Sequence, residues 1–289
     1  MAVQDYFVTI WGSKIHYTTE GRGKPILVLH GWPGSGGGFS ESMEIFLKAD
    51  PELEKLARKF FKKHKIIALD WPGFKKSQEL KGEYNLDYLA DFLNEFMKKT
   101  KIKGCDTLAV SMGGYISLTA QHKYGDLFGR MVIFGLAKDL SHVKFFNFSR
   151  LVMKLLGRRL TISLMNSIKN SDYVANRILS VLYPVSNKDT KQMQIYIEGV
   201  RRAPIRIHYE IIKQFLQKDF AANICHGINI PVTFVGAESD PIFPIDKIKE
   251  FASNIKNSKV IAVGGDDHGP FAHINEKIAL YKRLLNEFM

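Results

Sequence analysis

The sequence contains only two cysteines, Cys105 and Cys225, among 289 residues. They do not form a Cys-x-x-Cys pair, so neither a disulfide framework nor a thiolate zinc site is expected. A reducing, cytoplasmic compartment is the default prediction for such a chain. No apolar run approaches the ~18–20 residues of a membrane-spanning helix. The first residues, 1–6, have neither the basic nor the apolar region of a signal peptide, so none is expected.

Acidic residues are scarce relative to basic ones, with 29 Asp+Glu against 41 Lys+Arg and a formal net charge of +12. A net charge of this sign is typical of proteins that bind nucleic acid, anionic membranes or acidic ligands. It also occurs in many ordinary globular proteins. No nucleic-acid recognition motif is present, so nucleic-acid binding is not expected. Hydrophobic residues at 45% and aromatic residues at 12% predict a globular protein with a large core.

Eight short segments have the composition of strands. Residues 6–10 and 14–18 are rich in aromatic and β-branched residues, with a hairpin turn expected at Gly12-Ser13. Six near-continuous apolar runs are typical of strands buried on both faces: 26–29, 65–69, 106–110, 130–134, 231–235 and 259–263. Helical periodicity appears between them, at 86–97 and 274–288. This alternation predicts an α/β fold with a mostly parallel sheet flanked by helices.

One gap is too long for a simple helical crossover, because about 95 residues separate two consecutive strands where a dozen or somewhat more suffice. Residues 205–222 are predicted to form the crossover helix. Residues 139–204 are then an inserted helical cap, or lid, on a core made of 1–138 and 205–289.

The insertion (residues 139–204) holds 11 basic and four acidic residues, a net charge of +7, and it is rich in Phe, Leu, Met and Ile. Two interpretations stay open. In one, the apolar face packs on the core and the basic residues are solvated. In the other, the segment makes weak contact with a membrane surface or an amphiphilic substrate.

Ser111 follows the strand 106–110 and precedes a helix-like segment. Ala109 and Gly113, two residues before and after it, are small, as a sharp strand-to-helix turn requires. Such a turn exposes a serine hydroxyl at a helix N-terminus; the alternative is an ordinary N-cap serine. Ala109 stands where the motif usually has Gly.

A glycine-rich loop follows the strand 26–29, starting with His30-Gly31-Trp32-Pro33-Gly34. The dinucleotide-binding pattern fails because Phe39 occupies its third glycine position, and no Gly-Lys-Ser/Thr follows. An oxyanion loop fits better, since acyl transfer needs two backbone N–H groups directed at the developing negative charge. The candidates are the N–H groups of Trp32 and Met112, with His30 and Gly31 supporting the loop.

Two further strands end next to candidate catalytic residues. Asp240 follows 231–235, and His268 follows 259–263 in a second glycine-rich loop. A nucleophilic serine needs a base to take its proton and a carboxylate to orient that base. Because Ser111, Asp240 and His268 all follow parallel strands, we expect them at one edge of the sheet. Asp139 is an alternative acid, and Asp267 is interpreted as a loop carboxylate.

Taken together, these segments resemble the α/β-hydrolase-fold serine hydrolases over nearly the whole chain. The matching pieces are His30-Gly31-Trp32-Pro33-Gly34, Asp70-Trp71-Pro72-Gly73-Phe74, Ala109-Val110-Ser111-Met112-Gly113-Gly114, Gly236 to Asp240 and Gly265 to His268. The resemblance implies an eight-stranded sheet with a helical cap, Ser111 as nucleophile, His268 as base and Asp240 as acid. It also implies oxyanion donors at Trp32 and Met112, and a structural turn at Asp70.

The type of nucleophile narrows the expected chemistry. Relatives resembling haloalkane dehalogenases and epoxide hydrolases carry Asp where this chain has Ser111, so hydrolysis of a carboxylic ester with an apolar acyl part is favoured. Neither a metal nor an organic cofactor is expected. Alternatives are a lipase or lysophospholipase, a proline-releasing aminopeptidase, a C–C bond hydrolase, and a non-catalytic ligand-binding receptor. Either a monomer or a homodimer is expected.

Overall fold

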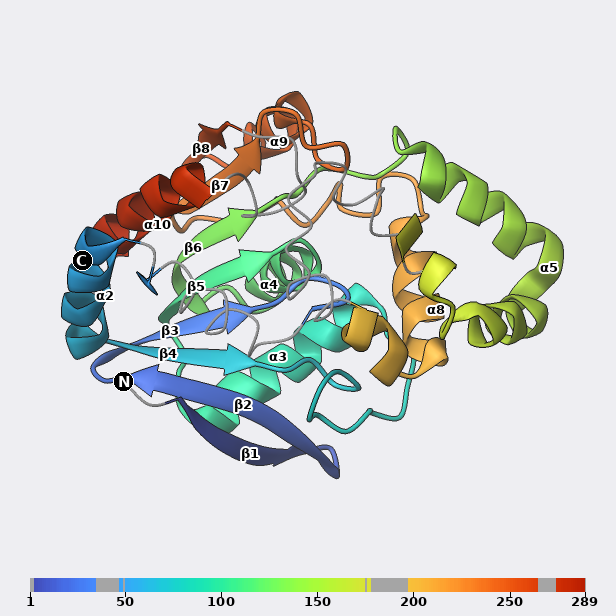
Figure 1. Cartoon of the computed structure of the whole chain (residues 1–289), viewed down its shortest axis with the longest axis horizontal. Coiled ribbons are helices and arrows are strands. Elements are labelled where there is room, and N and C mark those ends of the chain that lie inside the picture. Colours follow the sequence, from blue (N-terminus) through green and yellow to red (C-terminus); the bar gives the residue numbers. More distant parts are fainter. Residues whose placement is uncertain are drawn as a thin grey trace.

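The computed structural model describes residues 3–34, 47–48, 50–174, 176–177, 197–264 and 274–288. An eight-stranded sheet runs through them in the order β1-β2-β4-β3-β5-β6-β7-β8 (Figure 1). The strands are β1 (Gln4–Ile10), β2 (Ser13–Gly21), β3 (Lys24–Leu29), β4 (His64–Leu69), β5 (Cys105–Val110), β6 (Phe128–Phe134), β7 (Val232–Ala237) and β8 (Ser258–Val263). β2 runs antiparallel to β1 and β4, and the pairs from β4 to β8 are parallel. The predicted strands and the mostly parallel sheet are confirmed.

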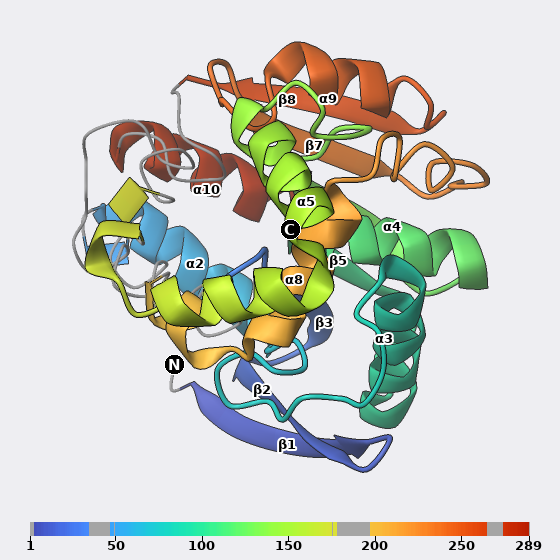
Figure 2. The ribbon, with the colours of Figure 1, turned by 90° about the vertical axis from the view of Figure 1, so that its right-hand side faces the viewer.

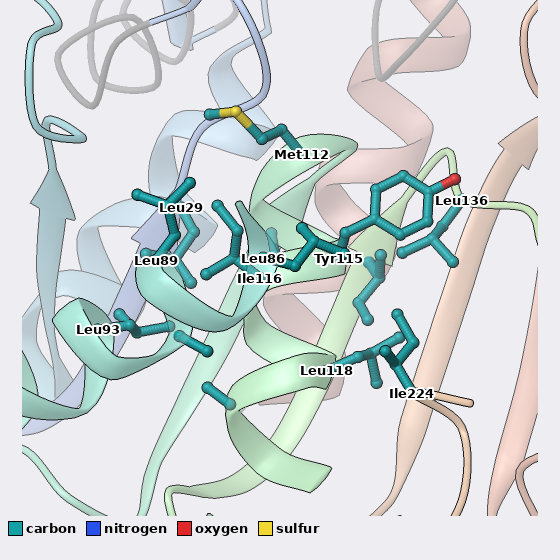
Figure 3. Packing of buried hydrophobic residues seen from close by; sticks show 14 of the residues in the cluster. Leu29, Leu86, Leu89, Leu93, Met112, Tyr115, Ile116, Leu118, Leu136 and Ile224 are labelled. Atoms are coloured by element: carbon teal, nitrogen blue, oxygen red, sulfur yellow. The ribbon is translucent and has the colours of Figure 1, made fainter. Parts of the chain in front are cut away.

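Helices cover both faces of the sheet. α2 (Pro51–Lys63) and α10 (Ile274–Phe288) pack on one face; α3 (Leu86–Thr100), α4 (Met112–Tyr124) and α9 (Ile245–Ala252) pack on the other. Successive residues of a strand point to opposite faces. Ile26 and Val28 therefore join the first layer, while Leu27 and Leu29 join the second. Figure 3 shows the second layer around α4.

Side-chain caps define where two of the helices begin. The Asn85 side chain accepts a hydrogen bond from the Tyr88 N–H at the start of α3 (2.9 Å), so the predicted helix over 86–97 is confirmed. α2 was not predicted. It begins after Asp50, whose carboxylate accepts from the Leu53 N–H (2.7 Å), and has Pro51 at its first position, a common helix-start signal.

The first hairpin turns one residue earlier than predicted. Ile10 pairs with Ser13, so the two turn residues are Trp11 and Gly12 rather than Gly12 and Ser13. Both have positive φ, 48° and 82°, as the tightest hairpins require. The prediction missed Trp11 because bulky residues rarely adopt this conformation. Its ring packs against Tyr88 and Phe92 of α3.

The predicted crossover helix exists but is shorter than expected. α8 (Ile205–Phe215) ends seven residues before Ala222. The chain then turns through Asp219, whose φ is 54°, so the following residues leave the helical path. Phe220 consequently packs against Tyr115 of α4, with ring centroids 4.7 Å apart.

The described part of the insertion is largely helical. α5 (Lys144–Ile168) bends at Gly157, where φ is 66° and ψ is 178°. It lies at the outer end of the molecule, with α8 between it and the sheet (Figures 1 and 2). The division into a core of 1–138 and 205–289 and a cap of 139–204 remains a prediction.

The structure also bears on the two cysteines and on the lack of long apolar runs in the sequence. Cys105 and Cys225 are both buried and unpaired. Among the residues that the structure describes, no helix is long and apolar enough to cross a membrane.

Candidate functional site

Ser111 sits at the apex of a sharp turn between β5 and α4. Its backbone has φ 46° and ψ −111°, a conformation that L-residues rarely adopt. The Ser111 N–H donates to the Phe134 carbonyl at the end of β6 (2.8 Å), which holds the turn against the sheet. The residue is half-buried. The side chain therefore stands at the carboxyl end of the parallel strands, at the N-terminus of a helix.

The small residues around Ser111 are required by close backbone contacts. A Cβ at Gly113 would lie 2.5 Å from the Leu29 carbonyl oxygen and 2.9 Å from that of His30, both too close. Ala109 is fully buried in β5 and pairs in register with Leu29. The turn thus forms with Ala in place of the usual Gly.

The loop after β3 approaches the same turn. A Cβ at Gly31 would lie 3.3 Å from the Ser111 Cβ and 3.2 Å from the Val110 carbonyl oxygen. The loop reverses direction through a hydrogen bond from the Gly34 N–H to the Gly31 carbonyl (2.8 Å). Met112 is the first residue of α4, so its N–H has no acceptor within the helix. Gly31 thus lies against the turn that holds Ser111. The roles of the Trp32 and Met112 N–H groups as oxyanion donors stay a prediction.

His30 supports this loop in a neutral state. The Trp71 N–H donates to its Nε2 (3.1 Å), and its Nδ1 donates to the Gly31 carbonyl (2.8 Å). Burial lowers the pKa of His30 to about 4. A neutral ring is needed here, because a proton on Nε2 would remove the acceptor for Trp71.

A second histidine, His208 of α8, holds the Trp32 side chain. The Trp32 Nε1–H donates to its Nδ1 (2.7 Å), and its Nε2 donates to the Val200 carbonyl (2.9 Å). Burial lowers the pKa of His208 to about 4 as well. Close by, a Cβ at Gly199 would lie only 2.1 Å from the Pro33 carbonyl oxygen. The end of the insertion and α8 thus fix the loop from outside.

Sequence reasoning missed His208 and Gly199. A histidine among the apolar residues of an amphipathic helix looks like an ordinary core residue. An isolated glycine in the sequence does not indicate which other segment it contacts. Only the fold shows that they meet the loop after β3.

Asp240 lies at the predicted sheet edge, after β7. It is 2% exposed, and its Oδ1 accepts hydrogen bonds from the N–H groups of Ile242 (2.7 Å) and Phe243 (3.0 Å). The Phe243 ring packs near Tyr115 of α4, with centroids 6.4 Å apart. The turn that holds Asp240 therefore contacts the helix that follows Ser111.

His268 and Asp267 lie outside the described residues, as do residues 35–40 of the first loop. The flanking elements are described. β8 ends at Val263, beside β7, and α10 begins at Ile274. The third member of the expected triad thus remains a prediction, on a segment that starts at the same sheet edge.

The alternative acid, Asp139, is engaged in a turn. Its Oδ1 accepts from the Ser141 N–H (2.9 Å) and hydroxyl (2.6 Å), and its Oδ2 accepts from the Asp219 N–H (3.3 Å). Burial alone raises its pKa, but the Ser141 hydrogen bonds outweigh it and the pKa is lowered. These contacts join the start of the insertion to the chain after α8, a structural role.

Asp70 is buried, and it makes hydrogen bonds with His16 and Ser77. Its Oδ2 lies 2.6 Å from the Nδ1 of His16 in β2, and its backbone carbonyl accepts from the Ser77 hydroxyl (2.7 Å). The next residue, Trp71, donates its Nε1–H to the His30 carbonyl (2.9 Å). This agrees with the expected structural turn near the site.

No group of three or more metal-ligating side chains occurs within the described ranges. What the arrangement offers is a strained serine at a helix N-terminus, backbone N–H groups beside it and a buried carboxylate at the same edge.

Comparisons with known proteins agree with this fold. A family model described as alpha/beta hydrolase fold matches residues 24–273. The 2-hydroxy-6-oxo-6-(2'-aminophenyl)hexa-2,4-dienoic acid hydrolase of Metapseudomonas resinovorans is 23% identical over 265 residues, covering 89% of this chain and 82% of that protein. A non-heme haloperoxidase of Rhodococcus erythropolis is 23% identical over 262 residues, covering 89% and 90%. The solved structure of an esterase from Exiguobacterium antarcticum aligns with a TM-score of 0.71 at 18% identity, covering 98% of this chain and 99% of that one.

Adding a methyl group at Gly113 should disrupt the turn. We expect Gly113→Ala to lower any hydrolytic activity by at least about a hundredfold, because the new Cβ displaces the end of β3. Ala109→Gly is the matched control and should keep at least half of the wild-type activity. Similar activities of the two variants in a p-nitrophenyl ester assay would contradict this account of the turn.

Lowering the pH should destabilise the protein through His30 and His208. Both histidines have ordinary pKa values near 6.5 when unfolded and about 4 when folded, so the unfolded chain binds protons first. Their contribution is complete above about pH 6.5 and is lost as the pH falls towards 4. We expect each to cost roughly 2 kcal/mol at pH 5.

His208→Gln keeps a donor and an acceptor but does not titrate, so its loss of stability between pH 7.5 and 5 should be smaller by roughly 2 kcal/mol. The exposed His226→Gln is the control and should behave as wild type. Urea denaturation at both pH values measures the difference. An unchanged acid dependence in His208→Gln would count against a neutral, buried His208.

Proposed function

The chain belongs to the alpha/beta hydrolase fold family, and from this premise we propose that it is a serine hydrolase that cleaves a small carboxylic ester with an apolar acyl part. One observation carries the proposal. Ser111 is held at positive φ between β5 and α4, with the backbone of the loop after β3 packed against it. An ordinary N-cap serine would use its hydroxyl to cap the helix, and no side-chain cap hydrogen bond from Ser111 is found in α4.

In the proposed reaction, the Ser111 hydroxyl attacks the ester carbonyl and His268 takes its proton. The negative charge on the carbonyl oxygen is stabilised by the N–H groups of Trp32 and Met112. His268 then protonates the leaving alcohol, and an acyl-enzyme remains. Water, activated by the same histidine, releases the carboxylic acid and restores the serine. Asp240 orients His268 and stabilises its protonated form.

The buried position of Asp240 supports its role as the acid. Two backbone N–H groups hold one of its oxygens, which fixes the carboxylate in a single orientation. The oxygens of Asp139 join the start of the insertion to the chain after α8, which is a structural role. Asp240 is therefore the better candidate.

A second candidate is hydrolysis of a carbon–carbon bond. The relative from Metapseudomonas resinovorans, which matches 89% of this chain, is named as a hydrolase of a 2-hydroxy-6-oxo-dienoic acid. The same nucleophile and donors could serve either bond. Turnover of such a dienoic acid, set against turnover of p-nitrophenyl esters, separates the two.

Removing the serine hydroxyl should abolish turnover. We expect Ser111→Ala to lower kcat for p-nitrophenyl butyrate by at least about a thousandfold, because the nucleophile is lost. A fluorophosphonate probe should label the wild type and not this variant. Ser253→Ala, at an exposed serine that ends α9, is the control and should react like the wild type. Absence of labelling in the wild type would favour a non-catalytic binding protein.

The acid can be identified by paired amide substitutions. Asp240→Asn should lower kcat on the order of 10³–10⁴-fold with little change in KM, because the histidine loses its orienting carboxylate. Asp139→Asn should leave kcat within about fivefold of the wild type and lower the melting temperature instead. The reverse pattern would make Asp139 the acid.

A further inference from the structure

We propose that the outer face of α5 docks on the surface of an anionic phospholipid bilayer. This inference concerns the insertion and does not depend on which bond the enzyme cleaves. It starts from an exposed apolar stripe. Phe148, Leu151 and Leu155 are 66%, 53% and 74% exposed, respectively. At 100° per residue, these three side chains fall within about 60° of one another around the helix.

The second arm of α5 repeats the pattern. Beyond the bend at Gly157, Leu160, Leu164 and Ile168 are 62%, 44% and 36% exposed. They are spaced by four residues and so lie along one side of the helix. Scattered exposed apolar residues are normal on a protein surface, but three aligned on each arm of α5 indicate an interaction surface.

The positive charge of this region favours an anionic partner. Residues 140–171 contain six basic residues and no acidic one: Lys144, Arg150, Lys154, Arg158, Arg159 and Lys169. Arg158 is paired with Glu210 of α8 (3.0 Å). Lys144, Lys154 and Arg159 are exposed, and within the described residues no ion pair involves them. On the first arm, Lys144 lies within the arc of the three apolar residues, and Lys154 flanks that arc, about 60° beyond Leu151.

The position of α5 leaves its outer face accessible. α8 contacts its inner side, and α5 is the outermost helix at this end of the molecule (Figure 2). An amphipathic helix with apolar residues flanked by lysine and arginine binds in the plane of an anionic membrane interface. A second copy of this chain is a poorer partner, because it would bring two strongly basic faces together.

Vesicle sedimentation tests the proposal with the full-length Ser111→Ala protein, so that no lipid is hydrolysed during the measurement. Vesicles of phosphatidylglycerol and phosphatidylcholine in equal parts should bind the protein at low ionic strength, and phosphatidylcholine alone should bind it at least about tenfold more weakly. Raising the salt concentration should weaken the binding. Equal binding to both vesicle types, or none to either, would overturn the proposal.

Two double variants distinguish binding through the α5 face from attraction by the overall net charge. Lys144→Glu with Lys154→Glu should weaken binding by at least about tenfold. Lys59→Glu with Lys98→Glu, at exposed lysines of α2 and α3, changes the net charge equally and should weaken it less than threefold. Equal losses in the two variants would mean non-specific attraction and would refute a docking face.

The apolar contribution has its own pair of variants. Leu151→Ser with Leu155→Ser should reduce binding severalfold, while Val3→Ser with Tyr6→Ser, at exposed positions before and within β1, should not. All variants should retain the wild-type melting temperature and, with Ser111 intact, hydrolyse soluble p-nitrophenyl butyrate at the wild-type rate. A concentration-dependent dimer abolished by the α5 substitutions, without vesicle binding, would show that a second copy covers this face and would overturn the proposal.

Discussion

The contact between Gly113 and the end of β3 is the constraint on which the site depends. Two backbones meet there with no room for a side chain, since a Cβ at Gly113 would overlap the carbonyl oxygens of Leu29 and His30. This contact fixes the turn that carries Ser111 relative to the loop that carries Trp32. The sheet register supports it, because β3 and β5 are direct neighbours and Leu29 pairs with Ala109. The site is therefore built from backbone positions that the parallel sheet itself determines.

The loop after β3 is held from three directions, by hydrogen bonds of neutral groups from two sides and by close packing from the third. Trp71 and His30 brace it from the core, and His208 holds the Trp32 indole from α8. Gly199 packs against Pro33 from the end of the insertion. Both histidines act as one donor and one acceptor, a role that a protonated ring cannot perform. The end of the insertion and α8 thus help to hold the loop after β3 in place.

Most of the fold could be predicted because the signals are local. Buried strands appear as apolar runs, and the helix over 86–97 shows its periodicity directly. Ser111 and Asp240 could be proposed as site residues because they follow two such runs, Ser111 directly and Asp240 after four residues. Trp11 was missed because its positive φ depends on the hairpin geometry, and the end of α8 was missed because the turn at Asp219 carries no strong signal. His208 and Gly199 act through contacts with residues more than 160 positions away, which no local pattern encodes. The position of His268 relative to Ser111 still rests on the order of the strands.

The bend of α5 at Gly157 has a consequence for how this insertion can evolve. A straight helix of 25 residues would extend about 37 Å in one direction. The bend instead brings the second arm back over α8, where Arg158 pairs with Glu210 and Thr161 is buried. The φ of 66° and ψ of 178° at Gly157 suit glycine alone. The direction of the second arm thus depends on one residue, and a change at this residue alters that direction without altering the sheet or the turn at Ser111.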